Sequence, residues 1–419
     1  MKLATRIPWW AWAWPLLAWG MLIIIASVGA SAVIATAAGV ALVATVFAAV
    51  LHAEVIAHRV GEPFGTLVLA VAVTVIEVSL IVFVMVGGGA NKAALARDTV
   101  FAVVMIVCNG IVGMCLLSGG VRHYEQGFQV QGASAALAVL AALTTLTLIV
   151  PNTTGTPGPF FSTPQLVFAG AVSLVLYGSF VFVQTVRHRD YFLPVFTEEE
   201  EVSASRPSGR IAIVSAGLLL TALIAVVGLA KALTPAVEVA VGRFGGPKPV
   251  VGIIIATLVL LPEGLAALKA ARANRLQTSL NLALGSALAS IGLTIPAVAA
   301  ISILLGQPLV LGLDAKEQVL LAITLLVGVI TLGTGRTTVL QGIVIWLSSL
   351  CFFSWQSCRS QALGARRQQR FWRHCLPPCL PYTAAVIGLR VIRTSSGHYS
   401  SIRKDERWFV ARSPMALRR

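Results

Sequence analysis

The stretch VAVTVIEVSLIVFVMV, residues 71–86, places one charged residue, Glu77, in the middle of an otherwise largely apolar run. The apolar sequence extends more than a helical turn on both sides of the glutamate, which suits a helix that crosses a lipid bilayer. A charge at the centre of a bilayer costs about 3 kcal/mol on insertion scales, so intramembrane charges usually mark functional sites. Glu77 is therefore the first candidate site residue.

The composition of the whole chain indicates an all-α polytopic membrane protein. The chain has 419 residues, a mean hydropathy of +0.87, and 57% apolar but only 11% charged residues. Soluble domains contain about 25% charged residues. The long apolar runs do not alternate as membrane barrel strands do. They predict eleven transmembrane helices, at residues 11–30, 32–52, 64–88, 98–119, 133–151, 165–186, 211–233, 249–268, 279–305, 318–334 and 337–355.

The basic residues of the short loops predict the orientation. Twelve Lys and Arg residues fall in one set of alternate loops and six in the other. Cytoplasmic loops carry the excess of positive charge, so we expect a cytoplasmic N-terminus. Five tryptophans among residues 8–19 are typical of an interfacial aromatic belt on a retained first helix, not of a cleaved signal peptide.

The longest loop between the expected spans is residues 187–210. It contains a Ser/Pro/Gly-rich stretch and four consecutive acidic residues, which are Glu198, Glu199, Glu200 and Glu201. Such a composition is typical of a flexible, solvated cytoplasmic linker.

This linker predicts an inverted repeat. If residues 1–31 form an extra transmembrane helix, five spans precede the linker (32–186) and five follow it (211–355). An odd number of spans in each half makes the second half insert upside down. That arrangement is typical of secondary transporters.

Only one other acidic residue lies well inside an expected span. It is Glu263, in VVGIIIATLVLLPEGLAALKAA (250–271). Glu77 lies thirteen residues into its span and Glu263 fourteen into its own. At a rise of 1.5 Å per residue, both lie about 20 Å from the start, past the middle of a core about 30 Å thick. Because the two spans run in opposite directions, a two-fold axis in the membrane plane would bring both glutamates to a shared central site.

Two carboxyl groups at this depth suit a site that binds cations and protons. Hard cations such as Ca²⁺ prefer several oxygen ligands, and carboxylates supply the negative charge. Burial favours the protonated carboxyl, so binding of one divalent cation would release two protons. The alternative is structural: two neutral carboxyls that hold helices together through hydrogen bonds.

Neighbouring polar groups are candidate supporting ligands. Thr74 lies three residues before Glu77 on the same helix face. Pro262 and Gly264 flank Glu263, where we expect them to break the helix and free backbone carbonyls. Further hydroxyl and amide groups lie on the spans that follow the two glutamates, at Asn109, Asn281, Ser286, Ser290 and Thr294. For the Ser and Thr residues the alternative is a bond to a carbonyl of their own helix.

Other classes of membrane protein fit the sequence less well. We find no P-loop and no soluble nucleotide-binding domain, which excludes a primary pump on this chain. We also find no His/Asp metal pair and no Ser–His dyad within the spans, so we expect neither an enzyme nor a cofactor. Energy must then come from an ion gradient. A cation channel stays open as an alternative, because selectivity filters also use rings of glutamate.

The segment LVLLPEGLAALKAARANRLQTSLNLALGSALASIGLTIP, residues 258–296, resembles the second α-repeat of the cation/Ca²⁺ exchanger superfamily. Its pattern is a carboxylate on one helix followed on the next by a motif that matches Asn274, Leu276, Ser279, Leu280, Gly285 and Ser286. The segment AHRVGEPFGTLVLAVAVTVIEVSLI (57–81) resembles the first α-repeat. The motifs HRVGEPFG, IEVSLI and LPEGLAALKA are most similar to the bacterial ChaA-type Ca²⁺/H⁺ and Na⁺/H⁺ antiporters, and the resemblance covers residues from about 50 to 342.

The resemblance implies ten core helices in two inverted repeats after an extra first helix. It implies a multi-pass protein of the bacterial inner membrane that exchanges cytoplasmic Ca²⁺ for protons by alternating access. Na⁺ or K⁺ are further candidate substrates, and a Na⁺/Ca²⁺-type exchanger without proton coupling is an alternative. Glu77 and Glu263 would bind cation and proton in turn. The acidic run Glu198–Glu201 becomes a candidate regulatory element.

The sequence departs from the superfamily pattern in two places. The Gly-Asn pair before each glutamate is here Val73-Thr74 and Val259-Leu260. The first-repeat motif G-S-I-L-S-N is here VMIVCN (104–109), which keeps only the Ile and the Asn. The candidate site therefore has fewer polar ligands than the superfamily pattern, which leaves the selectivity between Ca²⁺ and Na⁺ or K⁺ open.

The C-terminal tail, residues 356–419, differs in character from the rest. From residue 359 onward it contains 13 Lys and Arg residues against Asp405 and Glu406. The expected orientation places this basic tail outside, against the positive-inside tendency. One explanation is a shift of the reading frame near residues 342–355, which would make the tail unrelated to the family. The alternative is a true extension that binds anionic lipid.

Overall fold

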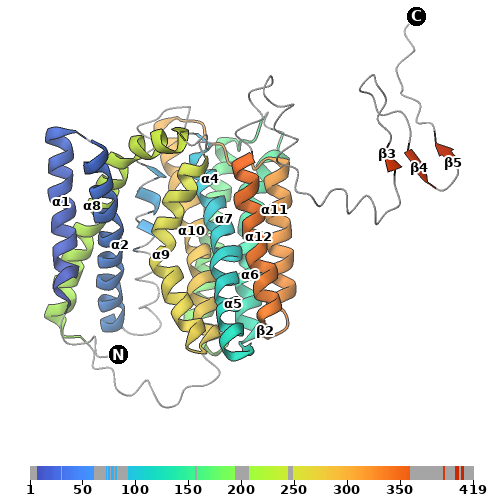
Figure 1. Cartoon of the computed structure of the whole chain (residues 1–419), viewed down its shortest axis with the longest axis horizontal. Coiled ribbons are helices and arrows are strands. Elements are labelled where there is room, and N and C mark those ends of the chain that lie inside the picture. The colour runs from blue at the N-terminus through green and yellow to red at the C-terminus, as the bar shows by residue number, and fades with distance from the viewer. Residues whose placement is uncertain are drawn as a thin grey trace, which may run out of the picture. The chain divides into compact units, whose positions relative to one another are not determined.

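The computed structural model is built almost entirely of helices (Figure 1). It describes residues 7–29, 31–60, 72, 74, 75, 77–79, 81, 82, 93–155, 158–193, 207–243, 249–358, 390–391, 402–404 and 407–409. Contacts divide the chain into two units, Met1–Ser357 and Cys358–Arg419. The second unit contains a small antiparallel sheet of β3 (Arg390–Val391), β4 (Ile402–Lys404) and β5 (Arg407–Phe409).

The first unit holds all the described helices. Those before the linker are α1 (Trp9–Val28), α2 (Ala32–Val60), α4 (Leu95–Met105), η2 (Ile106–Ile111), α5 (Val112–His123), α6 (Val130–Thr144), η3 (Thr145–Ile149), η4 (Val150–Asn152), α7 (Thr163–Phe182), η5 (Val183–Arg187) and η6 (Arg189–Phe192). Those after it are α8 (Gly209–Arg243), α9 (Pro249–Arg272), α10 (Leu276–Leu305), α11 (Ala315–Leu332) and α12 (Val339–Cys358). Segments η2, η3 and η5 are π-helical turns that continue a preceding α-helix.

The prediction of an all-α membrane protein is confirmed. Within the described ranges, eight helices are long and apolar enough to cross a membrane. The third expected span, residues 64–88, lies mostly outside the described residues, but those described between 72 and 82 are helical. Helices α2 and α8 extend to Val60 and Arg243, beyond the apolar windows that ended the expected spans at 52 and 233. The expected spans were shorter because polar side chains end an apolar run in the sequence, whereas the helix itself can continue past the edge of the bilayer.

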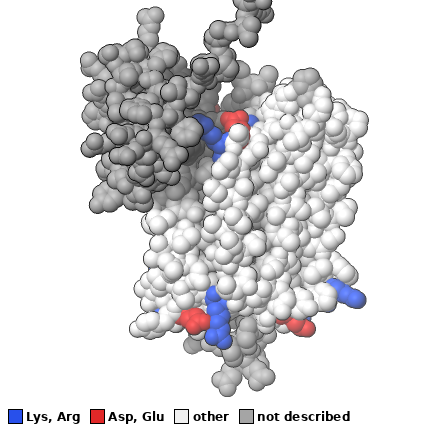
Figure 2. Space-filling model, turned by 90° about the vertical axis from the view of Figure 1, so that its right-hand side faces the viewer, with Lys and Arg blue, Asp and Glu red and all other residues white. Residues whose placement is uncertain are grey.

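The lateral surface agrees with a position in lipid. On α11 the exposed side chains include Val319, Leu326 and Ile330, and on α12 they include Leu340 and Leu347. Figure 2 shows this side of the molecule as a broad surface free of Lys, Arg, Asp and Glu between charged groups at its two ends. Such a band suits the hydrocarbon core of a bilayer.

Among the residues that the structure describes, the buried apolar side chains form two clusters. One joins α1, α2 and α8 through residues that include Ala38, Ala41, Ala225 and Leu229. Small residues let membrane helices approach closely. The larger cluster contains residues of the helices from α4 through α7 and from α9 through α12. Helices α2 and α8 pack far more on each other than either does on α9.

A short ribbon joins the two halves of the chain. Strand β1 (Glu125–Gly127), after α5, pairs in antiparallel fashion with β2 (Arg336–Thr338), before α12. Gln126 of β1 is buried and donates hydrogen bonds to the carbonyl of Ala271 (2.9 Å) and to Oδ1 of Asn274 (3.0 Å). The ribbon therefore ties the ends of α5 and α12 to the turn between α9 and α10.

The last helix packs as part of the first unit. Phe352 is fully buried and meets Phe101 edge-to-face, with ring centroids 5.6 Å apart. A Cβ atom at Gly342 would lie 2.4 Å from the backbone nitrogen of Leu117 on α5. Residues 342–352 therefore fit the core. The expected shift of the reading frame near residues 342–355 stays a prediction.

Gly342→Ala tests this contact. Because the clash is with backbone and not with a flexible side chain, α12 must shift, and we expect a loss of about 1–3 kcal/mol in stability. Thermal unfolding of the purified protein in detergent measures it. Gly178→Ala on α7 is the matched control, since nothing lies within 4 Å of its Cβ position. An equal melting temperature for both variants would contradict the close packing of α5 and α12.

Candidate cation-binding site

The first predicted glutamate is buried and held by a serine of the other half. Glu77 is only 5% exposed. The hydroxyl of Ser290 lies 2.6 Å from both carboxylate oxygens of Glu77, so one proton is shared between two acceptors. Thr74, one turn before Glu77, is also buried. A residue of the first half and a residue of the second therefore meet, although 213 positions separate them in sequence.

The second glutamate is held in the same way. Glu263 is 7% exposed, and its Oε2 atom accepts a hydrogen bond from the hydroxyl of Ser286. Ser286 and Ser290 lie four residues apart on α10 and therefore on one face of that helix. We call them the α10 serine pair.

The α10 serine pair fixes the spacing of the two carboxyl groups. Four residues of α-helix rise about 6 Å, so the two glutamates lie about one turn apart along α10. The expectation of one shared site for Glu77, Glu263, Ser286 and Ser290 thus agrees with their positions. Thr294, one turn further along α10, is buried, and its hydroxyl has no hydrogen-bond partner among the described residues.

The expected helix break at Glu263 is absent. Helix α9 runs without interruption from Pro249 to Arg272, with Pro262 inside it. The proline removes one backbone donor but leaves the helix assigned as continuous. Gly264 has a different role, because a Cβ atom there would lie 3.2 Å from Cδ1 of Ile111. Its lack of a side chain lets α9 approach η2, beside Glu263.

Asn109 lies on the π-helical turn η2 and is 1% exposed. Its amide nitrogen donates to the hydroxyl of Thr324 on α11, at 2.8 Å, and lies 3.9 Å from the sulfur of Met105. Among the described residues no hydrogen bond joins Asn109 to either glutamate. Thr324 was not predicted as a site residue, because a single threonine in an apolar span has no sequence spacing that links it to Asn109. π-Helical turns often occur at functional sites, since they widen the helix and redirect side chains.

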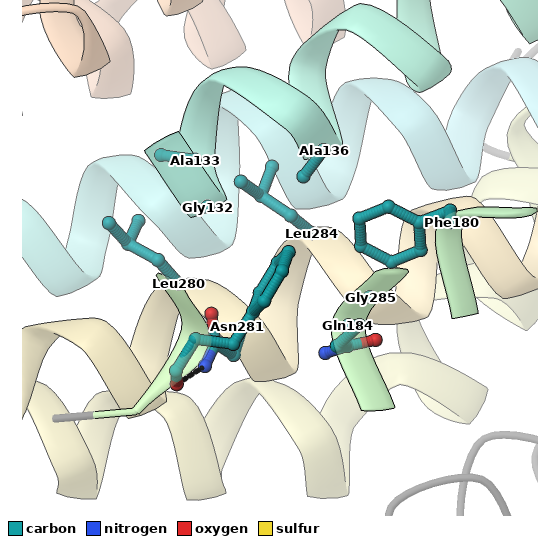
Figure 3. A pocket seen from close by; sticks show the side chains of 10 residues that line it. Gly132, Ala133, Ala136, Phe180, Gln184, Leu280, Asn281, Leu284 and Gly285 are labelled. Carbon is teal, nitrogen blue, oxygen red and sulfur yellow. Dashed lines mark hydrogen bonds between the residues drawn. The ribbon is translucent and has the colours of Figure 1, made fainter. Parts of the chain in front are cut away.

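Asn281 lies apart from the glutamates. Its Nδ2 atom donates to the backbone carbonyl of Phe192 at 2.6 Å, and its Oδ1 accepts from Nε2 of Gln277 at 2.9 Å. It lines a small pocket near the start of α10, shown in Figure 3. The expectation that Asn281 supports the glutamates is therefore not met by its contacts. The acidic residues Glu198–Glu201 lie outside the described residues.

The two carboxyl groups can bind protons or a cation, and binding of either weakens the affinity for the other. Each carboxyl has a hydroxyl beside it, and hydroxyl oxygens can donate to a carboxylate or act as ligands to a metal ion. A cation between the glutamates would offset the repulsion of two buried charges. Protons on the carboxyls would do the same.

The comparisons with known proteins show the family of the chain. The model of the sodium/calcium exchanger protein family matches residues 14–186 and 214–356. The chain is 51% identical over 352 residues to the putative ionic transporter y4hA of Sinorhizobium fredii, covering 81% of this chain and 94% of that protein. It is 36% identical over 299 residues to the sodium-potassium/proton antiporter ChaA of Escherichia coli, covering 71% of this chain and 81% of that protein.

Among solved structures, the H⁺/Ca²⁺ exchanger CAX has the same fold. The TM-score is 0.63 at 17% sequence identity, covering 82% of this chain and 87% of that one. The family match includes the helices that carry Glu77, Glu263 and the α10 serine pair, and it runs into α12. The chain therefore belongs to the sodium/calcium exchanger protein family and is an integral membrane transporter of the cation/Ca²⁺ exchanger superfamily.

Proposed function

We propose that this protein is a secondary antiporter that exchanges cytoplasmic cations for protons by alternating access. Glu77 and Glu263 form the shared site, and Ca²⁺ is the first candidate substrate, with Na⁺ and K⁺ as further candidates. The observation that carries the proposal is the pairing of one buried glutamate from each half with adjacent serines on one face of α10. Thr74, buried one turn before Glu77, is the further candidate ligand from the first half.

The relative depth of the two glutamates supports the proposed topology. Glu77 contacts the serine nearer the C-terminal end of α10, and Glu263 contacts the one nearer its N-terminal end. Two spans that run in opposite directions, each with its glutamate past the midplane, would give this order. The proposal places the N-terminus in the cytoplasm and the protein in the bacterial inner membrane.

The two apolar clusters support alternating access. Helices α1, α2 and α8 share one core, while the helices that carry the site share another. Two bodies with separate cores can slide or rock against each other without opening either core. In the proposed cycle this movement exposes the paired glutamates to one side of the membrane and then the other.

The proposal predicts coupled cation and proton movement that depends on both glutamates. Proteoliposomes with a trapped pH dye are given pulses of Ca²⁺, Na⁺, K⁺ or Mg²⁺. We expect at least one cation to drive proton movement, and Glu77→Gln or Glu263→Gln to slow it about 100-fold or more, as loss of a bond to a charged group can.

The control for this experiment is Glu317→Gln. Glu317 is also buried, but it belongs to the capping box of α11, where glutamine serves equally well. Exchange should survive in this variant. Antiport that persists in both site variants would show the paired glutamates to be structural. Cation flux without proton movement would favour a channel or an exchanger not coupled to protons.

The α10 serine pair should contribute to cation affinity. Ser286→Ala and Ser290→Ala each remove a hydroxyl that contacts a buried carboxylate, and we expect the KM for the cation to rise about tenfold. Ser173→Ala is the matched control, because that buried hydroxyl donates to the carbonyl of Ala169 in its own helix. Initial rates of exchange against cation concentration give the KM. Equal KM values for all three variants would show that the serine pair does not contribute to cation binding.

Competition at one site predicts the sign of the pH dependence. A protonated carboxyl does not bind a cation, so lowering the pH on the cation-loading side should raise the KM for the cation and leave the maximal rate largely unchanged. For release of two protons per divalent cation, the KM rises up to about 100-fold per pH unit where both carboxyls are protonated. Exchange rates at a series of pH values measure this slope. A KM that does not vary with pH would contradict a shared site.

A further inference from the structure

The hydroxyl of Thr294 on α10 lacks the bond that buried hydroxyls on other helices of this protein make. The hydroxyl of Thr144 donates to the carbonyl of Leu140 at 2.8 Å, and that of Ser173 to the carbonyl of Ala169 at 2.7 Å, each one turn earlier in its own helix. Thr294 is 0% exposed, and its hydroxyl has no hydrogen-bond partner among the described residues. A buried polar group without a partner is costly, so it calls for a water, an ion or a functional role.

Thr294 lies on the same face of α10 as the two serines that contact the glutamates. Ser286, Ser290 and Thr294 are spaced four residues apart, so their side chains follow one another along the helix at a rise of about 6 Å. Ser286 contacts Glu263 and Ser290 contacts Glu77. The three hydroxyls therefore form one row, and Thr294 extends it one turn beyond Glu77, on the side away from Glu263.

The other helices of the site carry apolar residues at the corresponding positions. Ala256 lies seven residues before Glu263 on the same face of α9 and is 2% exposed. Because α9 runs antiparallel to α10, this spacing places it near the level of Thr294 along α10. Ile81, four residues after Glu77, is 3% exposed and belongs to the same apolar cluster as Ala256. Thr294 is thus an oxygen-bearing side chain at a level where these two neighbouring positions are apolar.

We propose that Thr294 is a further cation ligand that acts on the outer side of Glu77, where its hydroxyl binds the cation as it enters or leaves the paired glutamates. This role rests on the proposed function for the identity of the site and for the topology, in which the C-terminal end of α10 faces outward. A hydroxyl oxygen can be a ligand to a hard cation such as Ca²⁺ or Na⁺. Because it is neutral, it holds the ion more weakly than a carboxylate does, which suits a step on the way out.

Thr294→Val tests this role, because it replaces the hydroxyl by a methyl group of nearly the same size. Exchange is measured in right-side-out and in inside-out membrane vesicles, so that Ca²⁺ or Na⁺ is offered on either side. We expect the ratio of the outer KM to the cytoplasmic KM to rise about tenfold, the effect of losing one good polar contact. Thr294→Ser keeps the hydroxyl and should restore the ratio of the parent protein.

Thr144→Val is the matched control. Thr144 is equally buried, but its hydroxyl bonds within its own helix, so the ratio of the two KM values should stay that of the parent. Thr294→Val with an unchanged ratio, including an equal rise of both KM values, would overturn the role of Thr294 on the outer side. So would the same rise of the ratio in Thr144→Val.

Thermal unfolding in detergent gives a readout that does not depend on transport. A hydroxyl without an internal partner adds nothing to stability, so Thr294→Val without cation should melt no lower than the parent. The rise in Tm on adding the cation should be smaller than in the parent, because the cation binds more weakly. A lower Tm in the absence of cation would instead show a structural bond and overturn the ligand role.

The two proposals fail in different ways. Parent protein that neither exchanges nor is stabilised by any of the cations would sink the proposed function and the role of Thr294 with it. Exchange that depends on both Glu77 and Glu263, but is unaffected by Thr294→Val on either side, would sink the role of Thr294 alone.

Discussion

The hydrogen bonds between the paired glutamates and the α10 serine pair are the constraint on which the rest of the structure depends. Two carboxyl groups in an apolar interior need donors, protons or a cation, because nothing else there offsets their charge. The donors come from a single helix face, so both glutamates must approach that face of α10. Helix α10 accordingly packs against α4, α6, α7 and α9 at the centre of the larger apolar cluster.

The described helices around this centre pack in two clusters. Glycines let helices approach closely where the backbone must fit, as at Gly264 beside Ile111 and Gly342 beside Leu117. Among the described helices, the cluster of α1, α2 and α8 has its own core and packs only lightly on α9. Polar network bonds instead gather at the helix ends, at Gln126 in the ribbon and at Gln277 and Asn281 in α10.

The sequence was sufficient for the fold class and for the residues that meet at the site. Long apolar runs predict helices in lipid, and a carboxylate within such a run is conspicuous because its cost is high, which is how Glu77 and Glu263 stand out. Ser286 and Ser290 follow from their place on the next span. The contacts of Asn109 and Asn281 could not be predicted, because an amide in an apolar span has several possible partners and the choice depends on tertiary packing. The continuous helix at Pro262 shows the same limit: a proline within a span lowers local helix stability, but packing on both sides can keep the helix intact.

The π-helical turns have a consequence for comparing the two halves of the chain. Only η2 lies within a span, between α4 and α5, whereas η3 and η5 end α6 and α7. A π-turn accommodates one residue more than an α-turn, so the side chains of α5 are rotated by about 100° relative to an uninterrupted helix. The departure from the superfamily pattern around Asn109 lies in this turn. An alignment of this span with an uninterrupted helix such as α10 therefore needs a gap at η2, and a search for internal duplication is better guided by the direction that each side chain faces than by matching letters.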